Sequence, residues 1–237
     1  MVRDKKKLQI YFGSNNLNMN KMKQVLMFII AILGCTVADA QYKVGDIYNN
    51  DGLKGIVVKV DNSGLHGLIM SLDKFSGKWY NDKKAKFLTD AFYEDDGEKN
   101  MAVIERYLSD NGQTWDKFPF FEWCRNKGAG WYAPALEEMN AILTAMNGSV
   151  GKYSVSNMEA FDKIIKDNGG DSLYGNTKLP MGGNMPYSLL TSTEANKGKV
   201  YVGAFFQTSP FGTPDAKTFE MSKTHGKYLG SRAIHKF

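Results

Sequence analysis

Two short apolar runs with a polar turn between them are the first clear pattern along the chain. Residues 56–60 (IVVKV) and 68–72 (LIMSL) are rich in β-branched and aliphatic side chains, and the segment 61–64 between them (DNSG) is typical of a turn. The pattern predicts a β-hairpin in the N-terminal part of the chain. His66 falls inside this hairpin, and because no second histidine is near it in sequence, we expect no metal site there.

Apolar positions then recur at helical spacing through the middle of the chain. The clearest series is Leu136, Met139 and Leu143. Before the helices, residues 73–99 are polar and irregular, with Trp79 in their middle. The spacing predicts four helices, at 100–109, 118–127, 136–146 and 157–167.

A proline and two glutamates mark the start of the third predicted helix. Pro134 is expected at the helix N-terminus, where its missing N–H leaves no hydrogen bond unmade. Glu137 and Glu138 fall in the first turn and complement the helix dipole. Adjacent helical side chains point about 100° apart, so these two carboxylates do not converge on one atom and acid–base catalysis is not predicted from them.

The fourth predicted helix is followed by a long segment without periodicity. Ser156 and Glu159 have capping-box spacing at the start of this helix, and Gly169 is expected to end it. The next residues, 169–188, are rich in glycine and asparagine. A loop of this length in a compact domain is usually functional or mobile.

The last fifty residues have the pattern of strands. Four β-prone segments are separated by turn residues, at 189–194, 200–207, 217–222 and 228–237. We therefore predict an α+β fold in which a hairpin comes first, helices follow and a twisted antiparallel sheet comes last. We find no second domain boundary after residue 40, so residues 41–237 are expected to form a single domain.

The N-terminal segment 22–40 has the features of a signal peptide. Lys23 provides a positive start, residues 25–33 form an apolar run too short for a stable membrane-spanning helix, and the ADA at 38–40 is a small-x-small cleavage pattern. We predict cleavage after Ala40. Residues 1–21 lie upstream, and are explained by a start codon assigned too early or by an extended n-region.

A second way of processing the leader stays open. Residues 32–35 (ILGC) resemble a lipobox, in which Cys35 would be lipidated and become the first residue of an anchored protein. Cleavage after Ala40 is favoured because leucine is unusual just before the glycine. Either route predicts export to the periplasm or the outer cell surface, and we expect no transmembrane helix in the mature chain.

Removing the leader changes the charge and the cysteine count. The whole chain has 30 Lys and Arg against 25 Asp and Glu, and residues 1–40 hold six and two of these, which leaves 24 against 23. A net charge of +1 gives no field for phosphates, so no nucleic-acid partner is expected. Cys124 alone remains, among apolar neighbours, so we predict no internal disulfide and a buried thiol.

Several segments together resemble secreted bacterial C-type-lectin-like domains, distant relatives of the formylglycine-generating-enzyme superfamily. GWYAP at 130–134 followed by LEEM at 136–139 is similar to their "GW-x-x-P-x-x-x-E" segment. LTSTE at 190–194 is similar to their next strand, SRAIHKF at 231–237 to their closing strand, and the opening YKVGDIY to the hairpin of a Gram-negative branch. The resemblance covers most of residues 42–237 and implies a C-type-lectin-like fold.

The resemblance implies structural roles for the motif residues rather than chemistry. Trp131 is expected in the core and Pro134 at a helix start, and an exposed Trp131 that stacks on a sugar is the alternative. The other residues assigned to the structural motif are Glu138, Ser192, Glu194 and Arg232.

The known activities of these families do not transfer to this chain. Formylglycine-generating enzymes need a pair of active-site cysteines, and only Cys124 is present in the mature chain. The calcium- and sugar-binding lectins carry a motif whose nearest match, TPD at 213–215, lacks the first ligand. We therefore expect no metal, no cofactor and no enzymatic activity.

The favoured function is a non-catalytic module that binds a glycan or an envelope protein through its loops. The aromatic and amide side chains of Gly-rich loops suit such ligands. The candidate ligand-binding residues are Tyr174, Asn184, Tyr187, Phe211 and Asp215. Two alternatives stay open: a structural or adhesive component of a surface assembly, and a glycan hydrolase in which carboxylates such as Glu194 and Asp215 meet through the fold.

Overall fold

The computed structural model describes residues 41–237 except 51, 150, 152–153, 179–183, 207–214 and 228. Gln41–Phe237 form one compact unit. The predicted cleavage after Ala40 and the possible lipid anchor at Cys35 lie outside the described residues. Within the described part of the chain, no helix has both the length and the apolar character needed to cross a bilayer.

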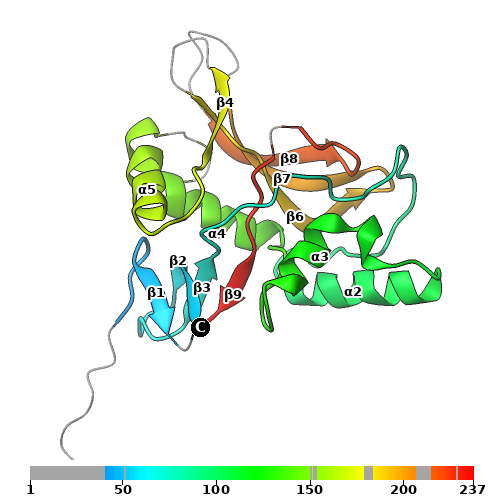
Figure 1. Cartoon of the computed structure of the whole chain (residues 1–237), viewed down its shortest axis with the longest axis horizontal. Helices are drawn as coiled ribbons and strands as arrows, with labels where there is room; N and C mark the ends of the chain where they lie inside the picture. The colour runs from blue at the N-terminus through cyan, green and yellow to red at the C-terminus, as the bar shows by residue number, and fades with distance from the viewer. Residues whose placement is uncertain are drawn as a thin grey trace, which may run out of the picture. The chain divides into compact units, whose positions relative to one another are not determined.

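The N-terminal strands and the C-terminal strand form one antiparallel sheet of order β1-β2-β3-β9 (Figure 1). Its strands are β1 (Ile47–Asn50), β2 (Leu53–Val60), β3 (Gly67–Met70) and β9 (Ile234–Lys236). The predicted hairpin is confirmed, because β2 pairs with β3 through Ile56 opposite Met70. The far C-terminal residues then add to this hairpin, with Ile234 opposite Met70.

The four predicted helices are present, although the first, second and fourth begin one to three residues away from the predicted starts. The helices are α2 (Gly97–Asp110), α3 (Pro119–Asn126), α4 (Leu136–Asn147) and α5 (Val155–Asp167), with a short 3-10 turn η1 (Trp115–Lys117) before α3. The predicted capping box at Ser156 is wrong, because Ser154 is the N-cap of α5 and accepts from Asn157 N. Pro134 precedes the N-cap Ala135, so it lies outside the first turn of α4.

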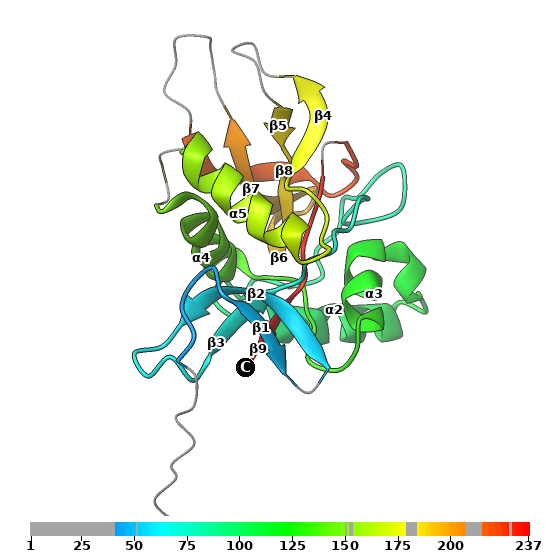
Figure 2. The ribbon, with the colours of Figure 1, turned by 60° about the vertical axis from the view of Figure 1, so that its left-hand side comes forward.

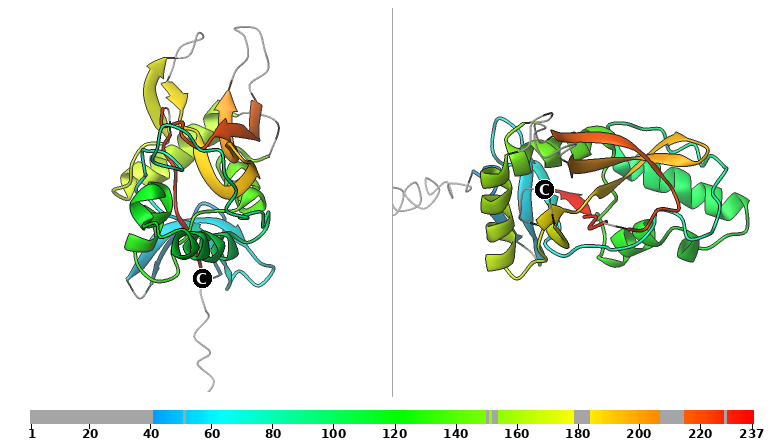
Figure 3. Two further views of the ribbon diagram at one scale, coloured as in Figure 1. Left: turned by 90° about the vertical axis from the view of Figure 1, so that its right-hand side faces the viewer. Right: turned by 90° about the horizontal axis from the view of Figure 1, so that it is seen from above.

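Helix α4 is the central helix of the domain. It contacts β2 of the N-terminal sheet and all three strands of a second antiparallel sheet of order β6-β7-β8, which lies on the other side of it (Figures 2 and 3). The second sheet consists of β6 (Leu189–Asn196), β7 (Lys199–Phe206) and β8 (Asp215–Ser222). The helix can pack on both sheets because Met139, Ile142 and Leu143 are fully buried.

Two expectations about the C-terminal half need correction. The segment 169–188 is not a continuous loop, since β4 (Tyr174–Lys178) and β5 (Asn184–Pro186) pair antiparallel within it. Within the described residues 229–237, the strand is confined to Ile234–Lys236, and this strand joins the N-terminal hairpin. Glycine and asparagine hide the strand pattern in the first case, and in the second the β-prone residues pair with a sheet that lies far away in sequence.

The core is rich in aromatic rings, and Trp79 lies at its centre. Trp79 is fully buried, its ring is edge-on to Phe118 and Phe121, and its Nε1 donates to Thr191 O at 3.0 Å. The irregular segment that carries it thus fills the core without regular structure. Cys124 is also fully buried, as predicted, and this burial raises the pKa of its thiol. The observed architecture is α+β.

Candidate ligand-binding site

The GWYAP segment is held in place by backbone contacts to both of the other motif strands. Tyr132 N donates to Ile234 O at 3.0 Å and Ile234 N donates back to Tyr132 O at 2.9 Å. Pro134 O accepts from Ser192 N at 2.7 Å. Gly130 has a φ of +79°, and a Cβ there would overlap the His235 ring, so both the backbone conformation and the close approach favour glycine.

Glu138 is a buried acceptor that joins two helix starts. Its Oε2 accepts from Ala135 N at 2.8 Å and from Gly97 N at 3.1 Å, and its Oε1 accepts from Tyr132 OH at 2.8 Å. Burial raises the pKa of the carboxyl, although these hydrogen bonds act in the opposite direction. Glu138 therefore does more than complement the dipole of α4, because it also holds the first turn of α2.

Glu194 and Arg232 are likewise buried and hydrogen-bonded. Glu194 forms an ion pair with Lys223, and both side chains are fully buried. Arg232 donates to Leu72 O and, at 2.6 Å, to Asp171 O. Burial lowers the pKa of Arg232 to about 10. These contacts are internal to the fold.

Trp131 lies at the edge of the core rather than inside it, so its assignment to the core is wrong. Its side chain is only partly buried, and its ring is edge-on to His235 at a centroid distance of 5.5 Å. Lys127 Nζ lies 5.2 Å from the Trp131 ring centroid. The backbone of the motif is fixed by the fold, whereas the indole stays accessible.

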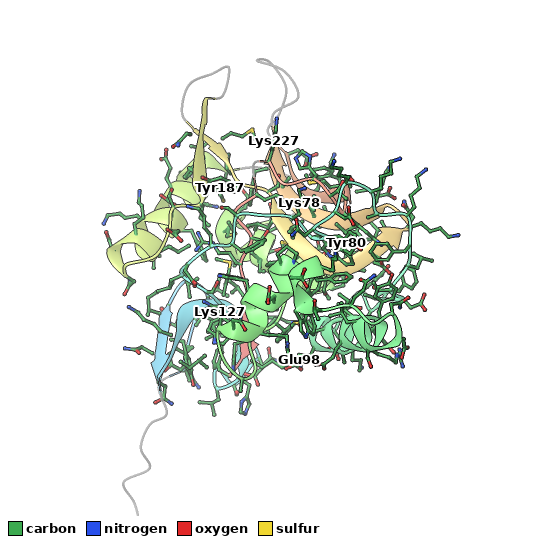
Figure 4. The ribbon with its side chains drawn as sticks, turned by 45° about the vertical axis from the view of Figure 1, so that its right-hand side comes forward. Lys78, Tyr80, Glu98, Lys127, Tyr187 and Lys227 are labelled. Carbon is green, nitrogen blue, oxygen red and sulfur yellow. The ribbon has the colours of Figure 1, made fainter. Side chains whose placement is uncertain are left out.

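Trp131 lines a cavity of about 260 Å³, which we call the α2–α3 cleft. One wall is the outer face of α2, because Glu98, Ala102 and Glu105 recur every three or four residues and so share a face. Figure 4 labels Glu98 on this helix and Lys127 just after α3. The complete lining is Glu98, Met101, Ala102, Glu105, Trp115, Arg125, Gly130, Trp131 and Tyr132.

The charges of the α2–α3 cleft are balanced by partners within the protein. Arg125 forms an ion pair with Glu105 at 3.5 Å, and its guanidinium lies 4.4 Å from the Trp115 ring centroid. Glu98 forms an ion pair with Lys236. The cleft therefore offers partly buried indoles together with hydrogen-bonding groups, and no uncompensated charge among these pairs.

The residues predicted to bind ligand lie elsewhere. Tyr174 is in β4, Asp215 begins β8 and forms an ion pair with Lys217 at 2.6 Å, and Tyr187 follows β5 with Lys74 Nζ 5.0 Å from its ring centroid. Figure 4 shows Tyr187 well separated from Glu98.

The rest of the predicted loop site is only partly described. Phe211 and the side chain of Asn184 lie outside the described residues. Beside this region, an apolar hollow of about 470 Å³ is lined by Met185, Ser188, Ala204, Phe205 and Phe219.

The carboxylates named for a hydrolase do not meet. Glu194 is opposite Val200, and Val200 is opposite Met221, six residues along β8 from Asp215. At about 3.3 Å per residue this places the two acidic positions on the order of 20 Å apart, at opposite ends of the sheet. Among the described residues, no group of three or more His, Cys, Asp or Glu side chains is arranged to hold a metal ion.

The sequence does not predict the α2–α3 cleft because its lining comes from four separate segments. Glu98, Ala102 and Glu105 look like an ordinary solvated helix face, and Trp115 stands in a short turn with no motif around it. The one available signal was the alternative considered for Trp131. No model of a known protein family matches this chain, and no curated protein is similar enough to count as a relative.

Proposed function

We propose that this protein is an exported, non-catalytic binding module of C-type-lectin-like architecture that binds a glycan in the α2–α3 cleft. The leader at residues 22–40 supports export to the periplasm or outer cell surface. The hydrogen bonds that join GWYAP to the LTSTE strand and to the closing strand support the architecture, because the segments that carry the resemblance meet in one place.

The observation that carries the proposal is the pair of accessible indoles in one cleft. Trp115 and Trp131 line the same cavity with Tyr132, and both indoles are only partly buried. An aromatic ring gives a sugar a flat apolar surface, while nearby polar groups bind its hydroxyls. Because Glu98 and Glu105 are already paired with Lys236 and Arg125, the cleft suits a neutral pyranose.

We propose binding rather than catalysis because the two carboxylates of the cleft, Glu98 and Glu105, lack the surroundings of a general acid. The side chains of Glu98 and Glu105 are 46% and 61% exposed, and each has a cation beside it. A glycosidase keeps one carboxyl protonated in an apolar pocket. Neither side chain has such a pocket, so binding is the chemistry that this cleft supports best.

Removing either indole is expected to weaken glycan binding. We expect Trp131→Ala and Trp115→Ala each to lower the affinity by roughly tenfold or more, since stacking and hydrophobic contact of one ring contribute about 1.5 kcal/mol. The measurement is a glycan array of neutral cello-, xylo-, manno- and galacto-oligosaccharides, followed by titration calorimetry on the hits.

Trp123→Ala is the matched control. Trp123 is a partly buried tryptophan of α3 that packs on Phe75 and Phe120 and does not line the cleft. The Trp123→Ala variant should bind sugars as the wild type does, and circular dichroism checks that the variant is folded. Equal loss of binding in Trp123→Ala and Trp131→Ala would contradict the proposal, as would the absence of binding to every sugar tested, neutral or acidic.

A further inference from the structure

A second hollow lies on the other side of the exposed ridge of α2. It has a volume of about 210 Å³ and is lined by Tyr93, Lys99, Ala102, Val103 and Arg106. We call it the Tyr93 hollow. Ala102 also lines the α2–α3 cleft, so the smallest exposed side chain of the helix separates the two cavities. The centres of the hollows are therefore on the order of 10 Å apart, the width of one helix.

The backbone before the Tyr93 hollow is fixed by buried side chains. Glu194 Oε2 accepts from Thr89 N at 2.9 Å and from Asp90 N at 3.0 Å. Asn100, itself fully buried, accepts from Tyr93 N at 2.9 Å and donates to Tyr93 O at 2.6 Å. The main chain around Tyr93 is thus held on both sides.

Two features suggest that this rigidity serves an interaction. Asp90 has a φ of +70°, which is uncommon for a residue other than glycine and marks stored backbone strain. Phe92 and Tyr93, which follow Asp90 after the buried Ala91, are nevertheless each 45% exposed. A rigid backbone that presents exposed aromatic rings loses little entropy on binding, which is typical of a recognition surface.

The charge of the Tyr93 hollow differs from that of the cleft. Lys99 and Arg106 are the two charged side chains in its lining. Lys99 lies 5.4 Å from the Tyr93 ring centroid and is paired with Asp96 at 3.2 Å. Arg106 has no ion-pair partner among the described residues, and its side chain is exposed. The lining of the hollow therefore includes a guanidinium without an ion-pair partner among the described residues, together with an aromatic ring.

We infer that the two hollows together bind one acidic oligosaccharide, with a neutral ring in the α2–α3 cleft and a carboxylate-bearing sugar in the Tyr93 hollow. This inference rests on the proposed glycan-binding function and names the class of ligand. Arg106 binds the carboxylate, because a guanidinium fork matches two carboxylate oxygens. The Tyr93 ring stacks on one face of the same sugar. The oligosaccharide crosses α2 at Ala102, where the exposed side chain is smallest.

An acidic sugar fits this surface better than an acidic peptide does. The two cavities are small and separate, and each is lined by an aromatic ring, which suits consecutive rigid rings. A peptide segment would instead need a continuous groove or an open strand edge. The exposed acidic residues Glu94 and Asp95 follow Tyr93 in sequence but do not line the hollow.

The test uses pairs of oligosaccharides that differ only in charge. Protein expressed from the full-length sequence is titrated with a galacturonate trisaccharide and its methyl ester, a hyaluronan hexasaccharide and its carboxyl-reduced form, 3′-sialyllactose and its methyl ester, and a hexaglutamate peptide. We expect at least one acidic sugar to bind about tenfold more tightly than its uncharged partner at low salt, and this difference to shrink at 0.5 M salt.

Four variants separate the two hollows. Arg106→Gln should remove the preference for the acidic sugar and leave the neutral sugar's affinity unchanged, and Tyr93→Ala should weaken the acidic sugar alone. Trp131→Ala should weaken both sugars. Lys59→Gln, which changes an exposed lysine of β2 away from α2, should change neither.

Each outcome decides between the two proposals. If neutral sugars bind as tightly as acidic ones, or if Arg106→Gln keeps the preference, the inference is wrong and the binding function stands. If no sugar binds, the proposed function fails and the inference fails with it. If only hexaglutamate binds, and Arg106→Gln abolishes that binding, the surface belongs to an acidic protein partner and the inference is overturned.

Discussion

At the scale of residues, buried polar side chains hold the irregular segments of this protein. Glu138 fixes the starts of α2 and α4, and Asn100 fixes the backbone of Tyr93. Gly97 lies so close to Ala133 O and to the Glu138 side chain that a Cβ there would overlap them. The shape of the α2–α3 cleft therefore depends on a few internal hydrogen bonds as well as on apolar packing.

Replacing Glu138 tests this role. Glu138→Ala should lower the free energy of unfolding by about 2–3 kcal/mol, because two buried N–H groups lose their acceptor. Glu138→Gln should cost less, since the amide oxygen can accept from both N–H groups and the amide nitrogen can donate to the Tyr132 hydroxyl. Urea unfolding of the three proteins is the measurement, and equal effects of the two substitutions would contradict this role.

The pH dependence of stability in the wild type and in Glu138→Gln gives a second test of the role of Glu138. Burial raises the pKa of Glu138 above its ordinary value of 4.5, so the folded state binds this proton more tightly than the unfolded state. The stability that this group contributes is complete below about pH 4.5 and is lost as the pH rises through the raised pKa. Because glutamine does not titrate, the stability of the wild type relative to Glu138→Gln should fall from pH 4 toward neutral pH. If the stability of the wild type relative to Glu138→Gln stays constant or rises with pH, burial does not raise the pKa of Glu138.

At the scale of elements, a buried ion pair joins the end of β8 to β6. Lys223 follows β8, forms an ion pair with Glu194 of β6 and donates to Phe87 O at 2.7 Å. Its ammonium also lies 5.0 Å from the Trp79 ring centroid. Burial lowers the pKa of Lys223, although the hydrogen bond to Glu194 acts in the opposite direction. The pair thus connects the second sheet to the segment around Phe87.

Replacing one partner of this ion pair should destabilise the fold more than replacing both partners. We expect Lys223→Met to lower the free energy of unfolding by about 3–5 kcal/mol, because it leaves the Glu194 carboxylate buried without its cation. The double variant Lys223→Met with Glu194→Gln should recover part of this loss. Guanidinium unfolding of the two single variants and the double variant tests the coupling, and strictly additive losses would mean that the ion pair contributes nothing.

At the scale of the whole molecule, the C-terminal segment joins three parts of the chain. Strand β9 completes the N-terminal sheet, and Ile234 also pairs with Tyr132 at the edge of the cleft. Just before β9, the Arg232 guanidinium donates to carbonyls at Leu72 and Asp171, which lie about a hundred residues apart in sequence. The C-terminal segment therefore connects the N-terminal sheet, the GWYAP segment and the chain around Asp171.

Arg232→Lys tests this connection while keeping the charge. A single ammonium cannot reach both carbonyls, so we expect a loss of about 2 kcal/mol in the free energy of unfolding. Arg106→Lys is the matched control, because Arg106 is exposed and should tolerate the change within about 0.5 kcal/mol. Equal stability of the two variants in urea would contradict the structural role of Arg232.

Local pattern was enough to predict most elements of this protein. The hairpin around residues 56–70 and the helices α2 to α5 follow from spacing that is repeated within a few residues, and each such signal is local. The exact helix starts were less predictable: the capping-box spacing favoured Ser156, whereas Ser154 is the N-cap of α5 in the structure.

The α+β class and the main helices could be predicted from the sequence alone. The leader, and the lack of an internal disulfide once it is removed, stay predictions from the sequence. The fold was needed to show that Trp79 is buried while Trp131 is only partly buried, and that β9 pairs with β3 from the other end of the domain. It alone brought Glu98, Trp115 and Arg125 to one cleft. The physical reason is that periodicity reports which face of an element is apolar, whereas a cavity depends on how faces from distant segments meet.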